Sequence, residues 1–162
     1  HRPDLIAGIG LICPGIYARQ QPGLLKTAAL VATGTLGINE KRIKIPLQEA
    51  ELFTDTREWQ EYIRRDPLTL REITLRFARA DRLLTRHVRK SGPYIHTPTL
   101  LLLAGREAIV DNHRTRLYFE TLAARDKTLI EYPNAAHTLE FEPDPVQFFE
   151  DLAAWIGKVT AG

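Results

Sequence analysis

The chain has 162 residues, of which 44% are hydrophobic, and its 22 Lys and Arg nearly balance its 20 Asp and Glu. This size and balance are typical of one folded domain and exclude a disordered tail. A single cysteine excludes an internal disulfide framework and a multi-cysteine zinc site, and a net charge of +2 argues against a nucleic-acid-binding protein.

Three short apolar runs predict the strands of a parallel sheet: residues 5–12, Thr99–Ala104 and residues 128–132. Each run is too short for a buried helix, and Pro, Gly or Asn residues bound it. Such runs are typical of strands that are covered on both faces. Cys13, directly after the first run, is expected to be a small core residue.

The long middle of the chain, residues 16–95, predicts a helical insertion between the first and second strands. Small residues favour a helix over residues 24–36, a proline-marked loop follows, and a charged stretch begins near Thr56. The strongest helix signal comes after Asp66-Pro67, where apolar residues recur at intervals of three or four. These residues are Leu70, Ile73, Phe77, Ala80, Leu84 and Val88.

Two more helices are expected after the second strand. Residues 112–125 carry an approximate helical stripe, so the second strand, this helix and the third strand predict a right-handed crossover. The last helix is predicted to begin with Asp144 as its N-cap and Pro145 at its first position. Its apolar residues, which should pack on the sheet, are Val146, Phe149, Leu152, Ala153 and Ile156.

A carboxylate and a histidine follow the second and third strands. Glu107 lies in "LLLLAGREAIVDN" and His137 in "YPNAAHTLEFEPDP". Because sites in open parallel sheets form outside the carboxyl ends of the strands, we expect these side chains to meet, with an oxygen about 2.6–3.2 Å from a ring nitrogen. A carboxylate on Nδ1 fixes the tautomer of a catalytic imidazole. Asp111 is the alternative acid, but we interpret it as the N-cap of the next helix.

The chain contains, in order, a first strand, a helical insertion, "DPLTLREITLRF", "PTLLLLAG", an acidic loop, "AAH" and a closing helix. This order resembles the C-terminal half of an α/β-hydrolase of the monoacylglycerol lipase and lysophospholipase type. The likeness covers essentially the whole chain. It implies an α/β fold with the first core strand in residues 1–15, a cap in residues 16–95 and the core that carries both site loops in residues 96–162. It also implies a serine hydrolase of lipid-like carboxylic esters without a cofactor, in which His137 is the general base and Glu107 replaces the usual Asp.

The chain lacks the G-x-S-x-G turn that carries the serine of this family, and its only serine, Ser91, is expected to be a linker residue. We therefore expect the nucleophile to lie on an N-terminal half of the same hydrolase, paired with residues 5–12, and this chain alone to be inactive. Two alternatives stay open: a non-catalytic module that binds a ligand or partner, and a related hydrolase with an Asp nucleophile.

The region from Arg64 to Lys90 is basic, with nine Lys or Arg against three acids. Such a pattern favours a solvated helix face or, alternatively, contact between the cap and an anionic membrane surface. No run approaches the roughly 20 apolar residues that span a bilayer, and a single cysteine suits an intracellular setting. We therefore expect a cytoplasmic chain that is at most membrane-peripheral. His87 and His113 lack partners at metal-ligand spacing, and no metal is expected.

Overall fold

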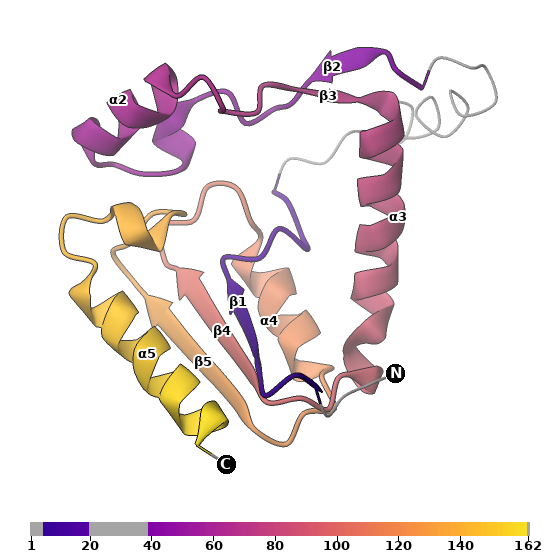
Figure 1. The fold of residues 1–162 in the computed structure, drawn as a ribbon, viewed down its shortest axis with the longest axis vertical. Coiled ribbons are helices and arrows are strands. Elements are labelled where there is room, and N and C mark those ends of the chain that lie inside the picture. The colour runs from indigo at the N-terminus through magenta and orange to yellow at the C-terminus, as the bar shows by residue number, and fades with distance from the viewer. Residues whose placement is uncertain (1–4, 20–38, 162) are drawn as a thin grey trace.

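The computed structural model describes residues 5–19 and 39–161, and the helix expected over residues 24–36 lies outside them (Figure 1). Its centre is a parallel sheet with the strand order β1–β4–β5. These strands are β1 (Ile9–Ile12), β4 (Thr99–Ala104) and β5 (Lys127–Tyr132). The described residues thus have the α/β architecture with three parallel strands that the sequence predicts.

The first strand is shorter than predicted. Leu5 and Ile6 were expected to begin it, but they are 69% and 54% exposed. In the described structure β1 pairs with β4 alone, and Gly10 and Ile12 are exposed, whereas every residue of the central strand β4 is buried. The ladder begins where Ile9 pairs with Thr99, the first residue of β4, so Leu5 and Ile6 lie before the start of the strand that β1 pairs with.

Two helices cover opposite faces of the sheet (Figure 1). The even-numbered residues of β4 pack with α5 (Val146–Thr160), and the odd-numbered leucines of β4 pack with α4 (Asn112–Glu120). This division follows from the strand, in which successive side chains point to opposite faces. Both faces are apolar because both are covered.

The face of α5 that packs on the sheet differs from the predicted one. Phe148 and Trp155 are buried, and Leu152 and Val159 pack against the same cluster. Two apolar stripes run along this helix about one residue apart, and spacing alone did not distinguish the packed one. The predicted stripe leaves three residues about half exposed: Val146 at 56%, Phe149 at 50% and Ile156 at 47%.

Helix α4 begins where the sequence predicts, and helix α5 begins one residue later than predicted. Asp111 is the N-cap of α4, and its Oδ1 accepts the N–H of Arg114 at 3.0 Å. Helix α5 begins at Val146, so Pro145 takes the N-cap position, while Asp144 accepts the N–H of Val146 at 3.3 Å. Helix α4 ends at Glu120, before the predicted end.

The described part of the insertion contains β2 (Arg42–Lys44), η3 (Ala50–Leu52), α2 (Arg57–Arg65), β3 (Glu72–Thr74) and α3 (Leu75–Ser91). Strands β2 and β3 pair antiparallel. Figure 1 shows α2 and this ribbon beyond the carboxyl ends of the three parallel strands, while α3 runs back along the side of the core. A short η4 (Gly92–Tyr94) then leads into β4.

The long helix expected after Asp66-Pro67 begins only at Leu75, because the residues before it form β3. Its N-cap is Thr74, whose hydroxyl accepts the N–H of Phe77 at 3.1 Å. Leu75 is its one buried residue, while Phe77 and Leu84 of the predicted stripe are 55% and 62% exposed. The apolar spacing therefore located a helix here but not its first turn or its buried face.

Candidate active site

The loops that follow β4 and β5 are bonded to each other at the carboxyl edge of the sheet. The N–H of Gly105 donates to the carbonyl of Tyr132 at 2.8 Å, and the N–H of Arg106 donates to that of Ala135 at 2.9 Å. Position 105 requires glycine, because a Cβ there would lie 2.4 Å from the carbonyl oxygen of Pro133. This close approach places the loop after β4, which carries Glu107 and is called the acidic loop, against the loop after β5, which carries His137 and is called the histidine loop.

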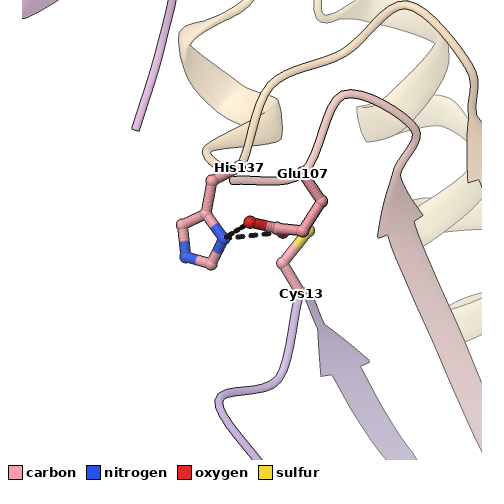
Figure 2. A group of neighbouring side chains, drawn as sticks. All are labelled: Cys13, Glu107 and His137. Atoms are coloured by element: carbon pink, nitrogen blue, oxygen red, sulfur yellow. Dashed lines mark hydrogen bonds and ion pairs between the residues drawn. The ribbon is translucent and has the colours of Figure 1, made fainter. Parts of the chain in front are cut away.

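Glu107 and His137 lie in contact at this point, as predicted (Figure 2). Nδ1 of the imidazole is 2.8 Å from Oε2 of the carboxylate and 3.0 Å from Oε1. The side chain of Glu107 is fully buried, and that of His137 is 19% exposed. The rival acid, Asp111, caps α4 instead.

The carboxylate of Glu107 is held by the backbone of its own loop. Oε1 accepts the N–H of Ile109 at 2.7 Å and that of Val110 at 3.1 Å. Burial raises the pKa of Glu107, but the hydrogen bonds from His137 and from these two N–H groups outweigh it, and the pKa lies below the ordinary value of 4.5. Glu107 is therefore ionised at neutral pH, and its charge favours the tautomer with the proton on Nδ1.

The other ring nitrogen of His137 points away from Glu107 (Figure 2). Within the part of the chain that the structure describes, no residue forms a hydrogen bond with Nε2. His137 lines an open cavity of about 480 Å³, whose other walls include Ile12 at the end of β1 and Phe148 and Phe149 of α5. An imidazole held in this way can accept a proton from a group that enters the cavity.

Cys13 is the third side chain of this cluster, and sequence reasoning placed it in the core without linking it to the site. It is 5% exposed, and its φ of 38° is in the left-handed region, which is uncommon for a residue with a Cβ. The sulfur lies beside the carboxylate of Glu107, and the potential ligand atoms of Cys13, Glu107 and His137 are within 4.8 Å of one another (Figure 2).

The protonation of Cys13 decides what this cluster can do. Burial, followed by the negative charge of Glu107, raises the pKa of the thiol to about 12. The thiol therefore stays protonated at neutral pH, whereas a metal ligand or a nucleophile needs the thiolate. We interpret Cys13 as a neutral neighbour of the acid.

Ser91 lies far from His137. It ends α3, near the amino ends of the parallel strands, whereas the histidine loop follows the carboxyl end of β5 (Figure 1). Its hydroxyl donates to the carbonyl of Val88 at 2.8 Å and is 3.3 Å from the hydroxyl of Tyr118. Ser91 was expected in a linker, but it is the last residue of α3, and its hydroxyl takes part in hydrogen bonds away from the histidine loop.

The comparisons with known proteins agree with this architecture. A family described as Serine aminopeptidase, S33 matches residues 1–144. The fold is similar to that of a monoacylglycerol lipase from Paleococcus ferrophilus, with 22% identity and a TM-score of 0.86 over 98% of this chain. It is also similar to a soluble variant of a monoglyceride lipase from Saccharomyces cerevisiae in complex with a substrate analog, with 19% identity and a TM-score of 0.75 over 95% of this chain. No curated protein sequence matches the chain significantly.

The chain spans 61% of the length of the first lipase and 54% of the second. None of the helices in the described ranges is long and apolar enough to cross a membrane. The family match covers most of the chain, and the parallel sheet with its flanking helices agrees with it. The chain therefore belongs to the α/β-hydrolase family described as serine aminopeptidase, S33.

Proposed function

We propose that this chain supplies the acid and the histidine of a serine hydrolase that cleaves carboxylic esters of the monoacylglycerol or lysophospholipid class. The observation that carries the proposal is the buried, ionised Glu107 on Nδ1 of His137, beside a cavity that His137 lines. Apolar side chains of Ile12, Phe148 and Phe149 in the cavity wall suit a lipid-like substrate.

In the proposed reaction, a serine outside this chain attacks the ester carbonyl carbon while Nε2 of His137 takes the hydroxyl proton. The imidazolium then gives this proton to the departing alcohol, which leaves an acyl-enzyme. Water, deprotonated by His137, hydrolyses the acyl-enzyme and releases the carboxylic acid. Glu107 stays ionised throughout and stabilises the imidazolium that forms in each half of the reaction.

The partner that we propose for this chain is the N-terminal half of the same hydrolase. Two observations support it: both lipases above are longer than this chain, and β1 has β4 as its one paired neighbour among the described strands. A parallel strand added beside β1 would end near Ile12, which is 40% exposed and lines the cavity with His137. The turn after such a strand would carry the nucleophile toward Nε2.

We further propose that residues 16–95 act as a cap and that α3 contacts an anionic membrane surface. The support is the position of α2 and the β2–β3 ribbon beyond the carboxyl edge of the sheet (Figure 1). On α3, Phe77, Leu83 and Leu84 are each more than half exposed among arginines. Binding to vesicles that contain phosphatidylserine, and not to phosphatidylcholine vesicles, is the expected result in a co-sedimentation assay.

The test uses a purified polypeptide that contains this chain together with the proposed N-terminal half. We expect it to hydrolyse a short-chain aryl ester and a monoacylglycerol, and His137→Ala to lower turnover by at least ~10³-fold. His113→Ala is the matched control, because His113 is exposed on α4 and should leave turnover unchanged. Preference for an aminoacyl arylamide over both esters would contradict the substrate class, and full activity of His137→Ala would contradict the mechanism.

A further inference from the structure

We propose that residues 53–56 of the insertion brace the histidine loop, and that Thr54 and Thr56 are positioning residues for His137. The inference rests on the proposed role of His137 as the general base. It assigns to the insertion a second task besides covering the site: it fixes the backbone that carries the imidazole.

Three hydrogen bonds join this segment to the residues directly after His137. The hydroxyls of Thr54 and Thr56 both donate to the carbonyl oxygen of Phe141, at 3.2 and 2.8 Å. The N–H of Thr138 donates to the carbonyl of Phe53 at 2.8 Å. Because Phe141 is the last residue of η5 (Leu139–Phe141), the brace holds both ends of the short turn that follows the histidine.

The two threonines use their hydroxyls in an uncommon way. Thr56 is the N-cap of α2, where a hydroxyl usually accepts an N–H of its own helix, yet its side chain makes no such bond. Thr54 is 0% exposed, and its oxygen also accepts the N–H of Thr56 at 3.1 Å. A buried hydroxyl needs a partner, so the carbonyl of Phe141 fixes Thr54 and the histidine loop relative to each other.

Aromatic side chains extend the same contact. The ring of Trp59 in α2 stacks on that of Phe141, with centroids 4.3 Å apart and planes 5° apart. The ring of Phe53 meets the imidazole of His137 edge-on at 6.0 Å and 74°. α2 and the segment before it therefore pack on the histidine loop as well as bonding to it.

The residue directly before His137 is held from within the loop. Oε1 of Glu142 accepts the N–H of Ala136 at 2.7 Å. The backbone is thus fixed by Glu142 before the histidine and by the insertion after it. Since a catalytic group displaced by about 1 Å can lose ~100-fold in rate, loosening either support should lower kcat more than it changes KM.

The test compares three isosteric variants of the polypeptide with its proposed N-terminal half. Thr56→Val removes the 2.8 Å bond, and Thr54→Val removes the 3.2 Å bond and the acceptor for the N–H of Thr56. Thr69→Val is the control, because the Thr69 hydroxyl donates to the carbonyl of Ile63 at 3.0 Å within the insertion. We expect kcat for an aryl ester to fall about tenfold in each of the first two variants, with KM unchanged, and to stay at the wild-type value in the control.

A second readout is the proton NMR signal of the His137 Nδ1–H, which a purely structural role of the threonines would not move. We expect this signal to broaden or shift in Thr54→Val and Thr56→Val. In Thr69→Val, and in Thr54→Ser, which keeps the hydroxyl, we expect the wild-type signal. Wild-type values of both kcat and the signal in Thr56→Val, which removes one partly exposed hydroxyl, would overturn the brace even if Thr54→Val does not fold.

The two proposals fail in distinguishable ways. A wild-type polypeptide that cleaves no ester would contradict the proposed function, and the Nδ1–H signal would still test the brace. An unchanged signal in both threonine variants would then overturn it.

Discussion

Replacing Glu107 by Gln removes the charge of the acid and keeps most of its contacts. The amide oxygen of Gln can accept the N–H groups of Ile109 and Val110, which now lie 2.7 and 3.1 Å from Oε1. The position of Oε2, 2.8 Å from Nδ1 of His137, then carries an NH₂ group. Because this group donates, Nδ1 must accept, and the ring proton moves to Nε2, the nitrogen that we propose takes the proton of the nucleophile.

The expected loss follows from this geometry. With the wrong tautomer and no charge to stabilise the imidazolium, we expect kcat to fall by ~10³–10⁴-fold with little change in KM. The assay is aryl ester hydrolysis by the polypeptide with its proposed N-terminal half, alongside circular dichroism as a check of the fold. Glu120→Gln, an exposed position on α4, is the matched control. Near wild-type turnover by folded Glu107→Gln would show that the charge of Glu107 is not needed for the reaction.

Three further predictions concern the site and the residues next to it. The pKa of Glu107 is lower in the fold than its ordinary value of 4.5, so the ionised side chain stabilises the fold. The free energy of unfolding in urea should include this contribution in full above about pH 4.5 and lose it as the pH falls through the folded pKa. Glu107→Gln should show a weaker dependence on pH. Gly105→Ala should separate the two site loops and lower the melting temperature, because its Cβ would lie 2.4 Å from the backbone of Pro133. Gly157→Ala is the control and should not lower it, because Gly157 is exposed on α5 with open space around the position of its Cβ. Cys13, with a pKa of about 12, should react with iodoacetamide at pH 8 roughly 10³-fold more slowly than a free thiol of pKa ~8.5. Peptide mass spectrometry measures this rate. A fast reaction in the folded protein would contradict the buried position of the thiol.

The parts of the fold that the sequence predicts well are those in which several signals coincide. The strand Thr99–Ala104 has the predicted bounds, because an unbroken apolar run with proline before it and glycine after it fits a central strand. Asp111 caps α4 as predicted, since a short acidic side chain before a helical pattern satisfies its first N–H groups. The contact between Glu107 and His137 was also predictable, because both follow strands that end at one edge.

The errors arise where an apolar pattern has more than one solution. Helix α5 carries two apolar stripes. Phe148 and Trp155 are buried because they pack against β4, and this tertiary contact cannot be read from the spacing within the helix. In α3 the spacing ran through Glu72–Thr74, which pairs with a strand about thirty positions earlier in the chain. Such long-range pairing overrides local helical spacing.

The side chains around Glu107 and His137 were the hardest to predict from the sequence. Nothing local connects Cys13 with Glu107, because 94 positions separate them and the parallel pairing of β1 with β4 brings them together. The same holds for Thr54 and Thr56, whose shared acceptor, Phe141, lies more than 80 positions away. Threonine at the start of a helix predicts a cap, and only the three-dimensional arrangement shows a different acceptor.

Whether His137 and Glu107 serve a serine nucleophile can be tested by labelling the polypeptide that contains this chain and its proposed N-terminal half with a fluorophosphonate. Mass spectrometry then locates the adduct. We expect a single labelled serine in the proposed N-terminal half. We also expect His137→Ala and Glu107→Gln to slow the labelling strongly, while Glu120→Gln does not. Labelling of Ser91, or labelling at the wild-type rate in His137→Ala, would contradict the assignment of His137 and Glu107 as the base and acid of a serine hydrolase.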